Sequence, residues 1–293
     1  MMIRSHRFAY LYSKNGYVGS HILWKIIDTF TKRPINKTVV ILPDGMPLTY
    51  EHDDWTCRTI YEGTYERELL SVLRNYKGEM LYVDAGANLG ATLWNAMSNL
   101  PASSNWLAFE PSNRCWDQLK NVGERIPSKG ILMPIALSNR NGTSFLSGSN
   151  NPNHSGVGTL RSEMIQTNDS VSISISTLDE VMSKNNPNST ISLLKIDTEG
   201  HESEVLSGAL GLIQQGKVLN LILEVSPMFG SLSYLEELES NLPTGYKWYE
   251  IREAGVFKKF PKLVETDFLD CKTKKNQFNL LIVSQPEKFE DTL

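Results

Sequence analysis

One stretch limits the possible fold more than any other: residues 80–90, MLYVDAGANLG. A short apolar run ends at Asp84 and leads into a turn, and a second apolar run with helical spacing follows. The turn contains Gly86, Asn88 and Gly90. This pattern is typical of a buried strand, a glycine-rich turn and a helix start. Because such turns let the backbone approach a nucleotide-like ligand closely, we expect a ligand site here.

Strands and helices alternate around this turn, which predicts an α/β fold with a parallel sheet covered by helices on both faces. The final strand is expected to close the sheet. The predicted strands are residues 81–84, 105–110, 130–136, 191–196, 218–225, 246–251 and 278–283. The predicted helices are residues 21–31, 66–76, 91–99, 114–124, 202–215 and 232–240.

Two regions depart from the alternation. Residues 37–50 contain a PDG turn between two apolar runs, which predicts a hairpin. Residues 139–176 are rich in Ser, Asn and Gly and end in SVSISIS, which predicts antiparallel strands with one wet face. We therefore expect an N-terminal helical and hairpin extension over residues 1–54. A domain over residues 55–293 would carry the polar β insertion.

Composition excludes several classes. The formal net charge of −4 argues against nucleic acid as the main partner. Cys57, Cys115 and Cys271 lie far apart without a CxxC pair, which indicates reduced thiols in a cytoplasmic protein and disfavours a zinc site. No apolar run reaches the roughly 20 residues that span a bilayer, and we expect neither a membrane span nor a signal peptide.

The turn favours one kind of cofactor over another. The dinucleotide fingerprint requires glycine where this chain has Asn88 and Ala91, so the pyrophosphate cradle is incomplete and NAD is disfavoured. S-adenosylmethionine lacks a phosphate and offers a cationic amine and two ribose hydroxyls. Glu110 ends the next predicted strand, where an acid accepts ribose hydroxyls in doubly wound folds. A helix N-terminal charge is the alternative interpretation of Glu110.

A third segment, residues 195–202 with the sequence KIDTEGHE, gathers charged residues after a buried strand near the expected centre of the sheet. Ligands of open α/β sheets bind at such strand ends. Asp197, Glu199 and His201 are candidate bases, although His201 could equally be a solvated helix-start residue. We interpret Glu202 as structural, because a negative charge at a helix start complements the helix dipole.

These segments together resemble the FkbM family of methyltransferases. The matching pieces are YEGTYERE (61–68), VDAGANLG (83–90), FEPS (109–112), IALS (135–138), STLDE (176–180) and LKIDTEGHESEVLSGA (194–209). The resemblance implies a Rossmann-like class I methyltransferase fold: a doubly wound, mostly parallel seven-stranded sheet with an antiparallel last strand. It also implies S-adenosylmethionine as cofactor and a hydroxyl acceptor on a sugar, glycan or natural product. His201 departs from the family pattern.

The resemblance carries roles to individual residues. The implied cofactor-binding residues are Glu66, Asp84, Gly86, Ala87, Asn88, Gly90, Glu110, Ser112, Ala136, Leu137, Ser138 and Asp197. Asp197 would also face the sulfonium and the acceptor. Asp197, Glu199 and Glu224 could converge on magnesium or calcium, but a metal is not favoured and we assign no metal ligand.

The expected reaction is in-line displacement at the sulfonium methyl by a hydroxyl oxygen, helped by alignment and a general base. One rival is an NAD-dependent oxidoreductase or epimerase of sugar nucleotides. It would need a complete glycine fingerprint and a Tyr-xxx-Lys pair, and Tyr10 and Lys14 lie too early in the chain for that role. The other rival is a cofactor-binding scaffold without catalysis, which the acids Asp84, Glu110 and Asp197 argue against.

Overall fold

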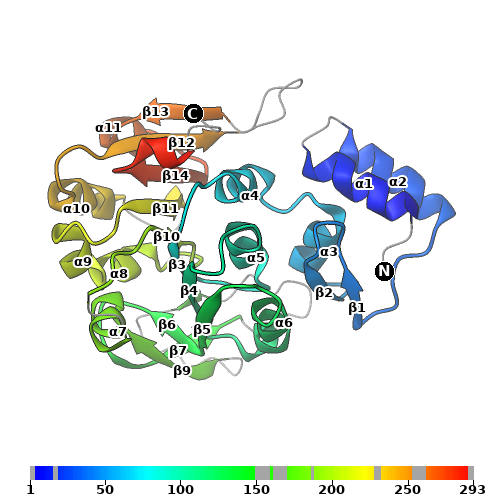
Figure 1. Ribbon diagram of the computed structural model, residues 1–293, viewed down its shortest axis with the longest axis horizontal. Coiled ribbons are helices and arrows are strands. Elements are labelled where there is room, and N and C mark those ends of the chain that lie inside the picture. The colour runs from blue at the N-terminus through cyan, green and yellow to red at the C-terminus, as the bar shows by residue number, and fades with distance from the viewer. Residues whose placement is uncertain are drawn as a thin grey trace.

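An eight-stranded sheet forms the centre of this computed structural model, which describes residues 4–15, 19–148, 159–160, 170–185, 188–227, 232–252 and 262–289. The strand order is β13-β12-β14-β11-β10-β3-β4-β5 (Figure 1). The five strands from β11 to β5 run parallel. Their bounds are β3 Leu81–Ala85, β4 Asn105–Phe109, β5 Lys129–Met133, β10 Leu193–Ile196 and β11 Asn220–Val225.

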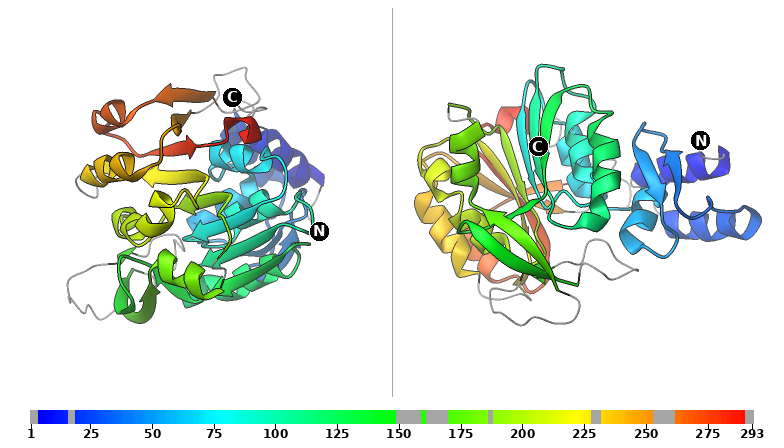
Figure 2. Two further views of the ribbon diagram at one scale, coloured as in Figure 1. Left: turned by 60° about the vertical axis from the view of Figure 1, so that its left-hand side comes forward. Right: turned by 90° about the horizontal axis from the view of Figure 1, so that it is seen from below.

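Helices cover both faces of this sheet, as the right-hand view in Figure 2 shows. Strand β3 explains why: Tyr82 packs into one apolar core and its neighbour Val83 into the other, since successive side chains point to opposite faces. The first core includes α4 Arg67–Arg74, α5 Ala91–Met97 and α6 Asn113–Gly123. The second includes α7 Leu178–Asn185, α8 Glu202–Ser207, α9 Leu210–Gln214, α10 Ser233–Asn241 and α11 Phe268–Lys272.

The far side of the sheet differs from the prediction. Strand β14, Phe278–Val283, runs antiparallel between β11 and β12, so it lies inside the sheet rather than closing it. Strand β12, Lys247–Arg252, follows it, and β13, Lys262–Thr266, forms the edge. The sequence therefore predicted the antiparallel last strand correctly. It predicted seven strands where this sheet has eight, because β13 was not predicted. The short 3-10 helix η2, Pro286–Phe289, follows β14.

The strands of the polar insertion belong to a second, four-stranded sheet with the order β6-β9-β7-β8. The predicted strand 130–136 in fact breaks at Pro134, which has no N–H to donate, and β6 Ile135–Leu137 joins this second sheet. β7 Gly142–Ser147 pairs antiparallel with β9 Val171–Ser176, and β9 alternates buried and exposed residues as predicted. β8 is Thr159–Leu160. Residues 149–158 and 161–169 of the insertion lie outside the described residues.

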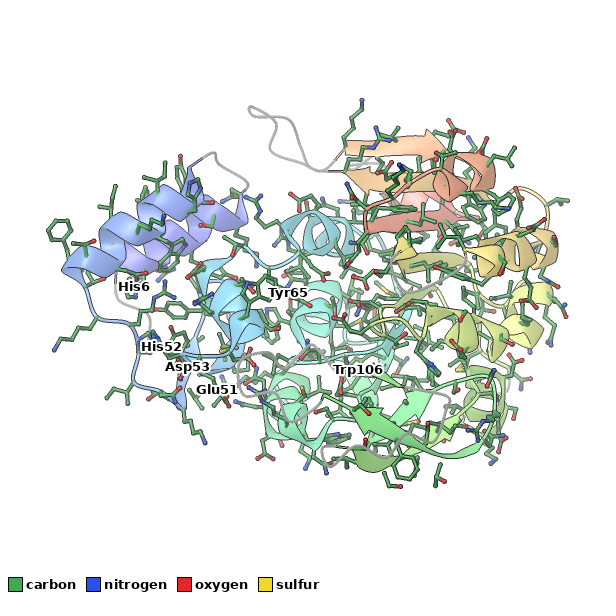
Figure 3. The ribbon with its side chains drawn as sticks, turned by 180° about the vertical axis from the view of Figure 1, so that it is seen from behind. His6, Glu51, His52, Asp53, Tyr65 and Trp106 are labelled. Atoms are coloured by element: carbon green, nitrogen blue, oxygen red, sulfur yellow. The ribbon has the colours of Figure 1, made fainter. Side chains whose placement is uncertain are left out.

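The N-terminal part contains the predicted hairpin, β1 Thr38–Ile41 and β2 Pro47–Tyr50, and two helices where one was predicted. These are α1 Arg4–Lys14 and α2 Ser20–Phe30, beside α3 Trp55–Glu62 (Figure 1). His6, labelled in Figure 3, joins these elements, because its Nδ1 lies 2.6 Å from the hydroxyl of Tyr61 in α3 and its Nε2 lies 2.7 Å from that of Thr31. The domain boundary at residue 54 stays a prediction, since α3 packs against both α1 and β2. None of the described helices is long and apolar enough to cross a membrane.

Candidate active site

Acidic side chains meet at the carboxyl edge of the parallel strands. Asp84 lies near the end of β3, Glu110 follows β4, Asp197 follows β10 and Glu224 lies near the end of β11. Parallel strands bring their carboxyl ends to one edge, where open α/β sheets bind their ligands. The structure thus gathers the three segments that the sequence singled out.

A buried ion-pair network centres on Lys195, a residue of β10 that is 1% exposed. Its Nζ lies 3.3 Å from Asp84 Oδ1 and 3.0 Å from Asp197 Oδ2, and it donates to the carbonyl of Gly86 at 3.0 Å. Burial alone would lower the pKa of Lys195, but the charges of the neighbouring acids outweigh it and raise the pKa. Lys195 therefore stays protonated and holds β3, β10 and the glycine-rich turn together.

Asp84 is completely buried. Its Oδ2 accepts a hydrogen bond from Thr92 Oγ1 at 2.7 Å, and its Oδ1 faces Lys195 without a hydrogen-bond partner among the described residues. Burial raises the pKa of Asp84, and the charge of Lys195 partly offsets this. Asp84 is thus held between Thr92 and Lys195.

The turn after β3 is fixed by its backbone. The amides of Gly86 and Ala87 both donate to the carbonyl of Phe109 at 3.1 and 3.0 Å, and Asn88 adopts a left-handed φ of 47°. Gly86 has φ 82°, and a Cβ there would lie 2.0 Å from the carbonyl oxygen of Asp197. Only glycine permits this approach of two backbones. Gly90 ends the turn as the N-cap residue of α5.

Glu110 ties two loops at the end of β4. Its Oε2 accepts from the amide of Asn88 at 2.9 Å and its Oε1 from the amide of Ser112 at 2.8 Å. Burial raises the pKa of Glu110 to about 7, although these two amides oppose the change. The side chain is 7% exposed, and each carboxylate oxygen keeps a lone pair for a further donor.

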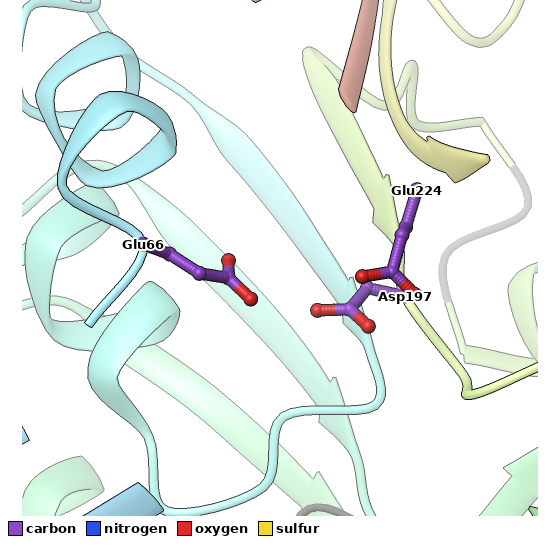
Figure 4. Close-up of side chains that lie close together, drawn as sticks. All are labelled: Glu66, Asp197 and Glu224. Atoms are coloured by element: carbon purple, nitrogen blue, oxygen red, sulfur yellow. The ribbon is translucent and has the colours of Figure 1, made fainter. Parts of the chain in front are cut away.

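Three carboxylates from separate elements converge beside this network (Figure 4). One oxygen each of Glu66, Asp197 and Glu224 lies within 4.8 Å of the others. Burial, with the charge of Asp197 as the next cause, raises the pKa of Glu66 to about 8 and that of Glu224 to about 10. The cluster differs from the predicted set, because Glu66 at the N-cap of α4 takes the place of Glu199.

The loop after β10 is held by Glu202, which the sequence analysis interpreted as structural. Its Oε1 accepts from the amides of Thr198 at 2.8 Å and Gly200 at 3.1 Å. Between them, Glu199 has a left-handed φ of 54°, and burial raises its pKa to about 7. The loop that carries Asp197 and Glu199 is therefore preorganised by the first residue of α8.

His201 is buried beside Ser138 and Glu204. It is 7% exposed, its Nε2 lies 3.0 Å from Ser138 Oγ, and its Nδ1 lies 3.5 Å from Glu204 Oε2. Burial lowers the pKa of His201 despite the charge of Glu204, so the ring is neutral at pH 7. Ala136, Leu137 and Ser138 are all buried in or after β6. The structure thus places His201 beside Ser138, one of the residues that the resemblance assigns to the cofactor.

Sequence reasoning did not assign a role to Lys195 or Thr92, and it considered Glu224 only as a possible metal ligand. Lys195 had a signal that could have revealed it. It interrupts the apolar run of β10, and a lysine inside a buried strand must be paired. Glu224 likewise interrupts the buried run of β11.

The profile of the methyltransferase FkbM domain matches residues 84–246. The chain belongs to the FkbM methyltransferase family. The match begins at Asp84 and covers the turn, Glu110, Asp197 and Glu224, so the whole carboxyl edge lies inside it. The predicted family is confirmed, and so is the predicted α/β fold with a mostly parallel sheet.

Solved structures of methyltransferases resemble the chain at low identity. The FkbM methyltransferase from Methylobacillus flagellatus has 14% identity and a TM-score of 0.44, over 78% of this chain and 55% of that one. This chain thus spans about half the length of that protein. A SAM-dependent methyltransferase from Agrobacterium tumefaciens has 12% identity and a TM-score of 0.42, over 87% and 72% of the two chains. No curated protein sequence gives a match.

Proposed function

We propose that this FkbM methyltransferase transfers a methyl group from S-adenosylmethionine to a hydroxyl oxygen of a sugar, glycan or natural product. The observation that carries the proposal is the acidic carboxyl edge, where Asp84, Glu110 and Asp197 surround a turn that has no complete phosphate cradle. Such a site suits a cationic ligand with ribose hydroxyls. It does not favour NAD, whose pyrophosphate is anionic.

The residues present fit this cofactor. Glu110 has free lone pairs and a small exposed surface for the two ribose hydroxyls. The turn 86–90, with Glu66, would hold the methionine end, Ser112 would lie near the ribose, and 136–138 would border the adenine. When bound, S-adenosylmethionine supplies an electrophilic methyl group on a cationic sulfur. The negative charges of this edge would favour that cation.

Residues of the 197–201 loop would serve the acceptor. Asp197 Oδ2 is bound to Lys195, which fixes the carboxylate, and the side chain remains 13% exposed for a hydrogen bond from an incoming hydroxyl. Glu199, two residues later, is the remaining candidate base on this loop. His201 has both ring nitrogens near protein partners, so we infer that it positions Ser138 rather than the acceptor.

Calorimetric titration of the full chain with S-adenosylmethionine, S-adenosylhomocysteine and NAD tests the cofactor. We expect the two sulfur ligands to bind and NAD not to bind. Transfer of labelled methyl groups to nucleotide sugars, oligosaccharides and hydroxylated natural products, with amine analogues beside them, then tests the acceptor. Binding without turnover on any of these acceptors would support the scaffold alternative, and labelled amines would overturn the hydroxyl assignment.

Glu110→Gln is expected to weaken S-adenosylmethionine binding about 10- to 100-fold, because hydrogen bonds to a charged group contribute about 1.5–3 kcal/mol. In the wild type the carboxylate becomes protonated as the pH falls below its pKa of about 7. Affinity should therefore decline below pH 7, and the Gln variant should lose this dependence. Calorimetry from pH 5.5 to 8.5 measures both, with Glu124→Gln on the surface of α6 as the control. Unchanged affinity in the folded variant would contradict the ribose assignment.

Asp197→Asn should lower kcat about 100-fold while changing S-adenosylmethionine affinity much less, because the hydroxyl loses the carboxylate that orients and polarises it. Single-turnover kinetics and calorimetry separate the two effects. Glu180→Gln, at a partly exposed position of α7 where Glu180 pairs with Lys184, is a matched loss of one carboxylate. Retained turnover in the Asn variant would show that Asp197 neither positions nor activates the acceptor.

A further inference from the structure

Glu224 has no role in the cofactor contacts proposed above, yet it is 4% exposed and acidic. Its Oε1 accepts a hydrogen bond from Gln277, which fixes the direction of the carboxylate. Its Oε2 is buried and has no hydrogen-bond partner among the described residues. A buried carboxylate oxygen without a donor is costly, so a ligand at this oxygen would be favourable.

The free oxygen of Glu224 belongs to a cluster with a defined geometry. Glu66 lies at the N-terminus of α4, Asp197 lies in the loop after β10, and Glu224 lies in β11. One carboxylate oxygen of each residue lies within 4.8 Å of the other two. Figure 4 shows the three carboxylates directed toward one another. Glu66 reaches in from a left-handed backbone, φ 33°, and its Oε2 is also buried without a described partner. Two oxygens of the cluster thus lack a donor in the part of the chain that the structure describes.

With all three acids ionised, the charges around the cluster would not balance. Lys195 pairs with Asp84 and Asp197. Over the described ranges, no basic side chain lies within ion-pair distance of Glu66 or Glu224. Bringing like charges this close without a cation is unfavourable at low dielectric. A positively charged ligand would remove this repulsion.

We propose that Glu66, Asp197 and Glu224 bind one divalent metal ion of the magnesium or calcium class. Carboxylate oxygens are the ligands that these hard cations prefer, and three of them leave further coordination positions for water or another oxygen. Gln277 would orient the Glu224 ligand, as outer partners of metal ligands commonly do. The ammonium group of S-adenosylmethionine is the rival occupant, because it offers the same sign of charge.

Direct metal binding tests the proposal without any methyl transfer. The full chain is freed of metals with a chelator and titrated with Mn²⁺ in the absence of S-adenosylmethionine, and bound Mn²⁺ is followed by electron paramagnetic resonance. We expect one Mn²⁺ per chain, displaced by Mg²⁺ or Ca²⁺. Glu224→Gln and Glu66→Gln should each weaken binding at least about tenfold.

Glu250→Gln is the matched control, because Glu250 lies in β12 of the same sheet, separated from β11 by β14, and pairs with Arg252 at 2.6 Å outside the cluster. It should bind Mn²⁺ like the wild type. Circular dichroism establishes that each variant is folded. If Glu224→Gln does not fold, Glu66→Gln decides, since Glu66 is less buried.

Two results would overturn the metal site. One is a folded wild type that binds no Mn²⁺, and the other is Mn²⁺ binding that both Gln variants leave unchanged. Absent Mn²⁺ binding together with weaker S-adenosylhomocysteine binding in Glu224→Gln would assign the cluster to the cofactor's ammonium group. Mn²⁺ binding by a chain that binds neither sulfur ligand would support the metal site and contradict the proposed function, so the two proposals fail separately.

Discussion

Lys195→Met is expected to lower the free energy of unfolding by about 3–5 kcal/mol at neutral pH, because breaking a buried ion pair leaves an uncompensated charge. Lys195 contacts Asp84, Asp197 and the carbonyl of Gly86 at 3.0–3.3 Å. Methionine fills a similar volume, so the change removes the charge and the donor while the packing stays comparable. Urea unfolding measures the loss.

The loss of unfolding free energy in Lys195→Met should depend on pH, because it depends on the protonation of Asp84. Burial already raises the pKa of Asp84, and without the charge of Lys195 this pKa rises further. An acid whose pKa is raised in the folded state contributes stability at low pH and loses it as the pH passes the folded pKa. The variant should therefore approach the wild type near pH 4 and diverge toward neutrality.

A double-mutant cycle identifies the partner. Asp84→Asn in the Lys195→Met background removes the orphaned charge, so the double variant should be more stable than the sum of the single effects predicts. Lys129→Met, at the exposed start of β5, is the control and should change stability by less than about 0.5 kcal/mol. A small effect of Lys195→Met at neutral pH, or additive effects in the cycle, would show that the pair does not hold the edge together.

The sequence predicted those parts of the fold that depend on local patterns. Three such features can each be recognised from a short stretch of sequence. They are the buried strand ending at Asp84, the glycine-rich turn, and the acid Glu110 one βα unit later. The alternation of SVSISIS gave β9 its two faces for the same reason. These features need no knowledge of which segments meet in space.

The differences arise where a tertiary contact overrides a local pattern. Residues 202–215 have a helical pattern but form α8 and α9, and Gly208 between them lies where a Cβ would stand 2.0 Å from the carbonyl oxygen of Ser138. The acidic cluster was only partly predicted, since its three acids come from elements far apart in the chain. Their meeting depends on the order β3, β10, β11 in the sheet, which a single sequence does not fix.

Gly86→Ala is expected to remove cofactor binding and to lower the free energy of unfolding by more than about 4 kcal/mol, beyond the usual range for a point mutation. The new Cβ would lie 2.0 Å from the carbonyl oxygen of Asp197 and 3.1 Å from its carbon. Neither the backbone at Gly86 nor the backbone at Asp197 can move away easily. Gly86 donates to Phe109, and the amide of Asp197 donates to Ala85 at 3.2 Å. Urea unfolding and S-adenosylhomocysteine titration measure the two effects.

Gly245→Ala separates the close approach from the cost of the backbone conformation. Gly245 has φ 99°, also in the left-handed region, but a Cβ there would meet no atom of the described residues within 4 Å. This variant should lose only about 1 kcal/mol and bind the cofactor normally. Equal losses in the two variants would show that φ alone requires glycine at position 86. A larger loss at 86 would establish that contact between the turn after β3 and the loop after β10 fixes the place of Asp197, which belongs both to the proposed cofactor site and to the acidic cluster.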